Sequence, residues 1–171
     1  MDQIVLISDS SCDLPKSCLD KYQIETIPFY VSFDGEHYFK EITELSIADF
    51  YQRLRAEKIF PKTSLPSIND YYEAFKPHIE AGKSVICVTL SSHFSGSHNA
   101  AVNARELILE NYPNAQIEII NSLNATGGEG ILVLEIARMI KEGLDFKTIL
   151  ETALKLREKA RIFFFVETLD Y

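Results

Sequence analysis

The chain has 171 residues and a formal net charge of −8, from 17 basic and 25 acidic side chains. This length suffices for one domain with a substantial apolar core, and the acidic balance argues against binding nucleic acid or an anionic membrane surface by electrostatic attraction. The 3 cysteines lack C-x-x-C spacing, which favours a reducing, cytoplasmic compartment over a zinc site or disulfide framework, and no apolar run approaches the roughly 20 residues of a membrane span.

The first predicted element is a short strand over residues 4–7, whose continuous apolar run is typical of a strand buried on both faces. Asp13 and Pro15 follow a polar loop and form the pattern of a helix N-terminus. We therefore expect Asp13 to be the N-cap of a short helix over 16–22.

A second strand is predicted over residues 24–33, because this stretch is rich in β-branched and aromatic residues. Pro28 lacks an N–H group, which favours an edge position for this strand. Asp34 and Gly35 form a strong turn signal, so residues 36–40 are expected to return as a hairpin partner.

Two helices are predicted in the next part of the chain. Ser46 is the expected N-cap of the first, which places four apolar residues on one face: Ile47, Phe50, Tyr51 and Leu54. Residues 60–67, rich in proline and hydroxyl groups, are predicted to form a loop. Ser67 or Asn69 then begins a second helix that ends at Gly82.

The rest of the chain repeats a strand, a polar loop and a helix. Strands are predicted over 85–88, 117–120 and 162–166, and helices over 96–112, 128–141 and 145–159. This alternation predicts an α/β domain over residues 1–160, with a mostly parallel sheet and helices on both faces. The run 162–166 completes this sheet or begins a second domain, and we interpret 161–171 as the start of a strand leading into a domain that is absent here.

Polar loops follow three of these strands, over residues 8–13, 89–97 and 121–128. The carboxyl ends of parallel neighbours lie at one edge, where open α/β sheets bind ligands. Helix N-termini at that edge offer free N–H groups to an anion. The loops therefore predict a site for a small anionic molecule, held by hydroxyl and amide donors.

Catalysis by Ser95 is an alternative interpretation. His93 and His98 are close to Ser95 in sequence, and Asp9 could orient such a base, as in a hydrolase or phosphotransferase. The local sequence lacks the first glycine of a G-x-S-x-G nucleophile elbow. The glycine-rich stretch 126–130 matches no phosphate-binding motif, so its glycines are interpreted as allowing close helix packing. The acidic and histidine residues have no recognised metal-ligand spacing.

Four segments together resemble the DegV family in order and spacing, and the resemblance covers essentially the whole chain. They are 8–15, 61–67, 90–97 and 121–128. The chain departs from the family pattern in having Ser97 and His98 after Gly96, Lys40 where aspartate is common, and Asn121 where another aspartate is common. Family members also continue through a second domain, so the resemblance is to their N-terminal portion.

The resemblance implies a protein that binds a long-chain fatty acid and presents its carboxylate to the catalytic subunit of a fatty acid kinase. It implies no enzyme activity for the chain alone and at most transient membrane contact. We also expect no cofactor, no metal and, from the net charge, no nucleic acid. Thr63 and Ser95, with Gly96 beside Ser95, match the family positions expected to bind the carboxylate. Ser64, Ser97, Ser10 and Asn124 complete the candidate lipid-binding set. An interaction domain without a ligand is a further alternative.

Overall fold

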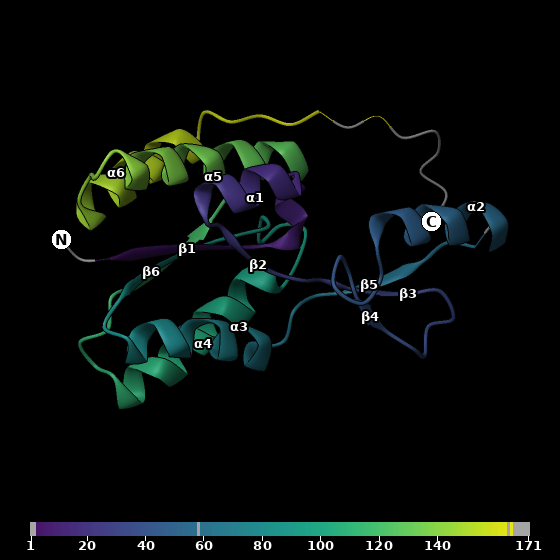
Figure 1. Ribbon diagram of the computed structural model, residues 1–171, viewed down its shortest axis with the longest axis horizontal. Coiled ribbons are helices and arrows are strands. Elements are labelled where there is room, and N and C mark those ends of the chain that lie inside the picture. Colours follow the sequence, from purple (N-terminus) through teal and green to yellow (C-terminus); the bar gives the residue numbers. More distant parts are fainter. Residues whose placement is uncertain (1–2, 58, 164, 166–171) are drawn as a thin grey trace.

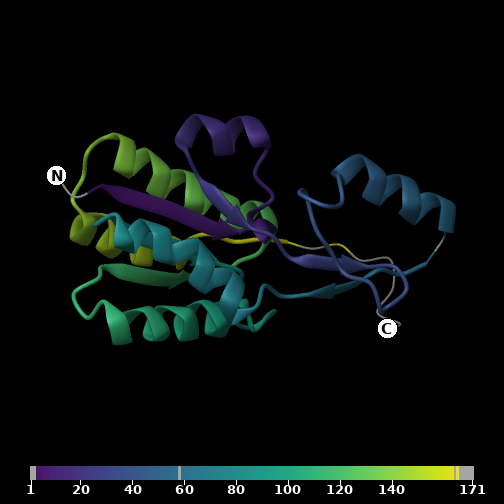
Figure 2. The same cartoon turned by 60° about the horizontal axis from the view of Figure 1, so that its bottom comes forward.

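The computed structural model describes residues 3–57, 59–163 and 165, and these residues form two sheets with helices (Figures 1 and 2). A parallel sheet has the strand order β2-β1-β6-β7, and an antiparallel sheet has the order β4-β3-β5. The parallel strands are β1 Ile4–Asp9, β2 Glu25–Ile27, β6 Ser84–Thr89 and β7 Ile117–Asn121. The antiparallel strands are β3 Tyr30–Ser32, β4 Phe39–Lys40 and β5 Lys62–Ser64.

Helices cover both faces of the parallel sheet. The helices are α1 Lys16–Tyr22, α2 Ile47–Glu57, α3 Ile68–Glu80, α4 Ser97–Asn111, α5 Thr126–Lys141 and α6 Phe146–Arg157, with a 3₁₀ turn, η1, over Ser10–Cys12. Of these, α2 lies beside the antiparallel sheet. Figures 1 and 2 show α1, α5 and α6 on one face and α3 and α4 on the other. The predicted α/β class, parallel sheet and two-sided helical cover are confirmed.

The core lies on the two faces of β6, which is buried along its whole length. Ile86 and Val88 pack with the cluster under α5 and α6, whereas Val85 and Cys87 pack with the cluster under α3 and α4. This alternation follows from the two-residue period of a strand. A strand buried on both faces reads as a continuous apolar run, which is why the sequence showed it clearly.

The predicted helix boundaries depend on local hydrogen bonds that the structure contains. Ser67 and Asp145 cap α3 and α6 with their side chains, and the Asp49 N–H donates to Ser46 Oγ at 3.1 Å at the start of α2. Gly82 and Gly143 adopt positive φ angles of 71° and 79° just after α3 and α5. Such caps act over a few residues and are therefore readable from sequence.

The predicted N-cap of α1 was wrong. Pro15 occupies that position, and Asp13 instead ends η1 in a left-handed conformation with φ of 50°. Asp9 caps this turn by accepting from the Ser11 N–H at 3.3 Å. The polar loop after β1 thus forms a separate 3₁₀ turn before α1 begins.

The predicted strand over 24–33 is two strands in different sheets. Pro28 separates β2 from β3, and the Phe29 N–H donates to Ser10 Oγ at 2.9 Å instead of to a neighbouring strand. The predicted hairpin is confirmed, since β3 pairs antiparallel with β4. The predicted loop over 60–67 was wrong in part, because it contains β5, which pairs antiparallel with β3. The antiparallel sheet and α2 extend away from the parallel sheet in Figure 1.

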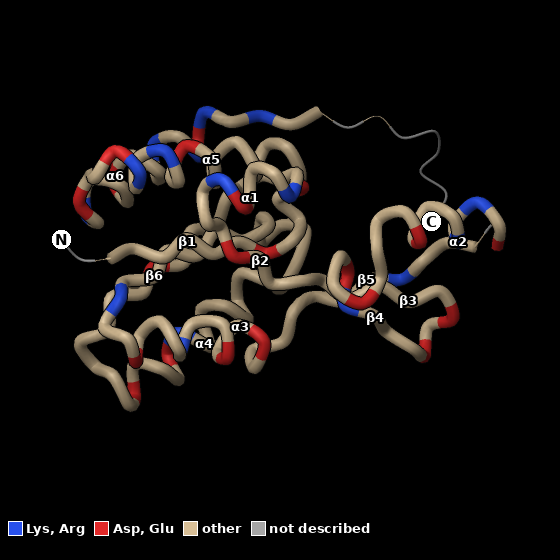
Figure 3. Tube along the Cα trace, viewed as in Figure 1, with Lys and Arg blue, Asp and Glu red and all other residues tan. Residues whose placement is uncertain are grey.

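Charged side chains of both signs lie on the outer helices. Figure 3 shows acidic and basic segments interspersed along α6. An example of the resulting pairs is Lys147 Nζ, 3.9 Å from Glu151 Oε1. Exposed pairs of this kind contribute little to stability.

The predicted strand over 162–166 falls at the end of the described chain. Ile162, Phe163 and Phe165 form no strand, and residues 164 and 166 lie outside the described residues. The side chains of Phe163 and Phe165 are 85% and 100% exposed. Most of the predicted segment 161–171 likewise lies outside the described residues.

Candidate functional site

Three polar loops meet at the carboxyl edge of the parallel sheet, as predicted. The loop after β6 is tied to β1 because the Leu90 N–H donates to Asp9 Oδ2 at 2.9 Å. It is tied to the loop after β7 because the Ser91 N–H donates to the Asn124 carbonyl at 3.0 Å. Hydrogen bonds between residues far apart in sequence thus join the three loops.

Ser95 is half-buried at the start of α4, and its hydroxyl has an unused proton. Ser95 Oγ accepts from the Ser97 N–H at 3.1 Å. Within residues 3–57, 59–163 and 165, no acceptor pairs with the Ser95 hydroxyl proton. Gly96 is the exposed N-cap of α4, where the first N–H groups of a helix lack partners within it. The two residues therefore present hydroxyl and amide donors to solvent.

Ser97 lies beneath this surface. Its side chain is fully buried, and its hydroxyl donates to Asp9 Oδ2 at 2.7 Å. The Tyr71 hydroxyl lies 2.5 Å from Ser97 Oγ and forms a second hydrogen bond with it. The structure thus places this predicted ligand residue inside the protein, where it holds the start of α4 against β1.

Thr63 and Ser64 lie on β5, opposite Val31 and Tyr30 of β3, and both are exposed. Leu65 follows at once and reaches α4, since its Cδ2 would lie only 3.3 Å from a Cβ added at Gly96. The end of β5 therefore adjoins the start of α4. Successive side chains of a strand point to opposite faces, so only one of the two hydroxyls can face a given ligand.

Thr63 borders a cavity of about 290 Å³ under α2. Val31, Leu45 and Phe50 give this cavity apolar walls, and Glu41 lies at its polar side. Burial raises the pKa of the Glu41 carboxyl. A polar rim beside an apolar interior suits an amphipathic ligand.

Ser10 and Asn124 support the loops from within. Ser10 is buried; its hydroxyl accepts from the Phe29 N–H at 2.9 Å and donates to Glu41 Oε1. Ser10 thereby joins the two sheets. Asn124 is also buried, and its Nδ2 donates to the Ser122 carbonyl at 3.2 Å. Neither side chain lies on the exposed surface where Ser95 lies.

A buried pair of acids, Asp9 and Glu129, was not predicted to work together. Both side chains are fully buried. Glu129 Oε1 accepts from Ser8 Oγ at 3.2 Å, and its Oε2 lies 2.9 Å from Ser11 Oγ. Burial, and then the negative charge of Asp9, raise the pKa of Glu129 to about 9. The only sequence signal was an acidic residue within a glycine-rich and apolar helical stretch.

The glycines beside Glu129 allow close packing, as expected for Gly128 and Gly130. A Cβ at Gly130 would lie 2.5 Å from the Cys12 carbonyl oxygen, and one at Gly128 would lie 2.7 Å from Asn124 Oδ1. A Cβ at Gly127 would meet nothing within 4 Å. Close packing therefore accounts for Gly128 and Gly130 but not for Gly127.

The arrangement does not resemble a serine hydrolase site. Ser95 Oγ pairs with the Ser97 N–H, whereas His98 Nδ1 lies 3.1 Å from Thr89 Oγ1. Burial lowers the pKa of His98, and Asp9 accepts hydrogen bonds from the loop rather than orienting an imidazole. Across the described ranges, no group of three or more histidine, cysteine, aspartate or glutamate residues could hold a metal ion.

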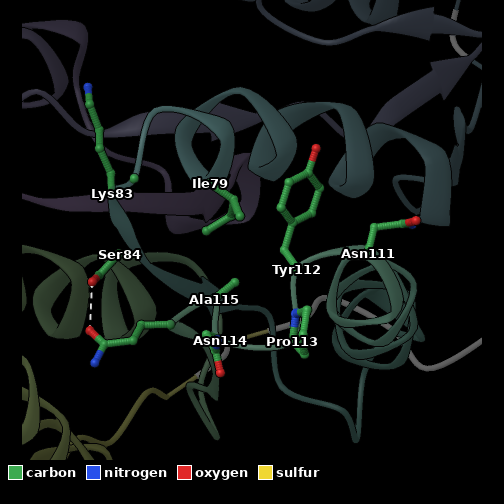
Figure 4. A pocket seen from close by; sticks show the side chains of 10 residues that line it. Ile79, Lys83, Ser84, Asn111, Tyr112, Pro113, Asn114 and Ala115 are labelled. Carbon is green, nitrogen blue, oxygen red and sulfur yellow. Dashed lines mark hydrogen bonds between the residues drawn. The ribbon is translucent and has the colours of Figure 1, made fainter.

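A larger cavity of about 560 Å³ lies at the opposite, amino edge of the sheet (Figure 4). Ile79 and Tyr112 line it near the C-terminal ends of α3 and α4, with Lys83 close by and Ser84 bonded to Gln116 at 2.8 Å. The C-terminal end of a helix carries partial negative charge. This end is therefore less suited to an anion than the polar loops, although its cavity is larger.

Comparison with known proteins connects this fold to a family. A family model described as uncharacterised proteins of the DegV family matches residues 3–171. A DegV domain-containing protein of Clostridium acetobutylicum is 34% identical over 172 residues, covering 100% of this chain and 59% of the relative. In the part of the chain that the structure describes, no helix is long and apolar enough to cross a membrane.

Solved structures agree with this assignment. A stearic acid-binding protein of Eubacterium ventriosum superposes with a TM-score of 0.83 and 40% identity, covering 90% of this chain and 52% of that chain. A DegV family protein of Thermus thermophilus, described by its fatty acid binding, has a TM-score of 0.78 and 25% identity, covering 91% and 54%. The chain spans about half the length of these relatives, and it belongs to the DegV family.

Proposed function

We propose that this chain forms the carboxylate-binding part of a protein that binds a long-chain fatty acid. The observation that carries the proposal is the contact between Leu65 and the Gly96 position, which joins the Thr63 strand to the Ser95 loop. The fatty-acid binding described for its structural relatives supports the same ligand class. Ser95 and Gly96 bind the carboxylate, and Thr63 adds a second hydroxyl from β5.

Binding of this kind divides the ligand between two environments. A carboxylate removed from water needs several donors, because an unpaired buried charge is strongly unfavourable. The Ser95 hydroxyl and the Gly96 N–H supply them, since the Ser97 N–H is bonded to Ser95 Oγ. Each buried CH₂ of the tail contributes about 0.8 kcal/mol, so the tail supplies most of the affinity. We expect part of a long acyl chain to occupy the cavity of about 290 Å³ beside Thr63, on its apolar side away from Asp13 and Glu41.

The remaining donors in the predicted set act indirectly. Ser97, Ser10 and Asn124 are buried and hold the three loops in place. Ser64 neighbours Thr63 but faces the other side of β5, so we expect a weaker contribution from it.

We further infer that the protein is a non-catalytic subunit, acting in the cytoplasm, that presents the bound carboxylate to a fatty acid kinase. The hydrogen bonding of Ser95 supports the non-catalytic part, because among the described residues its Oγ contacts the Ser97 N–H and no general base. The kinase partner rests on the family resemblance, and the compartment rests on the number and spacing of the cysteines.

Stearate binding by single variants tests the carboxylate site. Removing one donor to a charged group loses about 1.5–3 kcal/mol, which corresponds to a loss of affinity of roughly tenfold to a hundredfold. We expect such losses in Ser95→Ala and Thr63→Ala, with a smaller loss in Ser64→Ala. Isothermal titration calorimetry measures the affinity, and circular dichroism verifies the fold. Unchanged affinity in both Ser95→Ala and Thr63→Ala contradicts the proposal.

A further inference from the structure

The buried acids Asp9 and Glu129 hydrogen-bond each other and both contact Ser11, and no cationic side chain of the described residues pairs with either. Ser11 Oγ lies 2.5 Å from Asp9 Oδ1 and 2.9 Å from Glu129 Oε2. Ion pairs between described residues involve neither acid. Two uncompensated charges this close inside a protein are strongly unfavourable.

Counting protons on these hydrogen bonds indicates how the acids share their charge. A serine hydroxyl has one proton, so Ser11 can donate to only one of its two carboxyl neighbours. Its shorter contact is to Asp9, which also accepts from the Leu90 N–H and Ser97 Oγ at 2.9 and 2.7 Å. Asp9 is therefore the carboxylate, and Glu129 is the carboxylic acid whose proton is donated to Ser11 Oγ.

Asp9 holds both ends of the Ser95 loop, which comprises residues 89–97. The Leu90 N–H lies at the start of this loop, and Ser97 lies at its end. Only two hydrogen bonds separate Asp9 from Ser95, one to Ser97 Oγ and one from the Ser97 N–H to Ser95 Oγ. The position of the Ser95 hydroxyl thus depends on Asp9.

We propose that Glu129, Ser11 and Asp9 form a proton-sharing relay that positions the Ser95 loop for carboxylate binding. The inference rests on the proposed function and adds three positioning residues to it. A single negative charge on the pair clamps the loop through Asp9. A second charge would repel both Asp9 and an anionic ligand bound above it.

The neighbouring titratable groups do not neutralise a second charge. Tyr71 of α3, Cys12 of η1 and Cys87 of β6 act electrostatically on this pair, and burial raises the pKa of each of these three side chains. Glu41, at the antiparallel sheet, adds a further acid near Asp9. All of these groups are neutral or acidic. Loss of the Glu129 proton at alkaline pH should therefore loosen the loop.

Carboxyl NMR of the full chain tests the relay without any ligand. We expect the Glu129 side-chain signal to titrate near its raised pKa of about 9, and the Leu90 amide signal to shift with the same midpoint. In Glu129→Gln the Leu90 amide should no longer shift in that range. A Glu129 signal that titrates near its ordinary value of 4.5, or a Leu90 amide that ignores Glu129, overturns the proposal.

Stearate affinity as a function of pH provides the functional readout. Between about pH 7.5 and pH 10, we expect affinity to fall about tenfold in the parent and to stay level in Glu129→Gln, a typical size for coupling between two sites. Glu135→Gln is the matched control, because Glu135 lies on the same helix with a side chain that is 41% exposed. The stearate affinity of Glu135→Gln should fall with pH as in the unmodified protein. An affinity of Glu129→Gln that falls by the same amount overturns the proposal.

A second variant and the NMR titration, which needs no ligand, distinguish failure of the relay from failure of the proposed function. If Glu129→Gln does not fold, Ser11→Ala serves instead, because it removes the hydroxyl that both acids contact. In this variant the Leu90 amide signal should shift less at the pH where Glu129 titrates. If the parent binds no stearate at any pH, the proposed function fails. The NMR titration then still decides whether the relay positions the loop.

Discussion

Replacing Gly130 by alanine is expected to destabilise the protein and to displace η1, the turn that carries Ser10 and Ser11. Gly130 lies on α5, where it packs against η1, the turn that follows β1. An added Cβ would lie 2.5 Å from the Cys12 carbonyl oxygen and 3.1 Å from Leu14 Cδ2. The first of these contacts is to backbone, so it cannot be relieved by rotating a side chain.

The magnitude follows from the distance deficit. Carbon and oxygen atoms in close contact are usually about 3.3–3.6 Å apart, so α5 and η1 must separate by roughly 1 Å. Overpacking of a well-filled interior costs about 1–3 kcal/mol. Alanine also favours a helix over glycine by up to about 1 kcal/mol. Gly127→Ala receives that gain without the clash, so the two variants should differ by about 1–3 kcal/mol.

Urea unfolding of the two variants measures this difference. Gly130→Ala should be less stable than Gly127→Ala and should bind stearate more weakly, because displacing η1 moves Ser10 and Ser11. Each 1 kcal/mol should also shift Tm by about 2–4 °C for a chain of this size. Equal stability of the two variants would refute the packing argument, since it would show that α5 moves away from η1 at no cost.

Three further predictions concern buried groups. The pKa of Glu129 is about 9 in the folded state against an ordinary 4.5, so the folded state retains a proton that the unfolded chain loses. The stability contributed by this group is therefore greatest below pH 4.5 and should fall by up to about 1.4 kcal/mol per pH unit until pH 9. Urea unfolding at several pH values should find a smaller slope in Glu129→Gln. Burial raises the pKa of Cys12 to about 11 and raises that of Cys87 well above its ordinary value, so iodoacetamide at pH 8 should alkylate the partly exposed Cys18 first, as read by mass spectrometry; early modification of Cys87 would contradict its burial. Tyr71→Phe removes a hydroxyl from a fully buried side chain and should lower the unfolding free energy by about 1–2 kcal/mol, which chemical denaturation can measure; no change would mean that this hydroxyl has no net role.

Features set by neighbouring residues were predictable from the sequence. The parallel strands appeared as apolar runs, and the caps of α3 and α6 appeared as Ser67 and Asp145. The convergence of the three loops followed from the alternation of strands and helices, which predicts parallel neighbours whose carboxyl ends share one edge. Each of these inferences depends on interactions within a few residues, or on the general rule that strand–helix–strand units give parallel neighbours.

Features set by distant partners were not predictable. The division of the 24–33 stretch depends on Ser10, whose hydroxyl takes the Phe29 N–H. The Thr63 segment read as a loop because its partner in the antiparallel sheet, β3, lies some thirty residues earlier. A three-residue strand carries too little periodicity to be recognised without that partner.

The candidate site shows the same division in its chemistry. Ser95 and Gly96 could be identified because hydroxyl and glycine at a helix N-terminus are a local pattern for binding anions. Glu129 could not, because its environment comes from Ser8 and Ser11, more than a hundred residues away in sequence. A second buried carboxyl group beside Asp9 is unfavourable at an anion-binding edge unless it keeps its proton. The fold meets this condition by burying Glu129 beside Asp9, so the residue least expected at such a site is the one whose protonation is coupled to the position of Ser95.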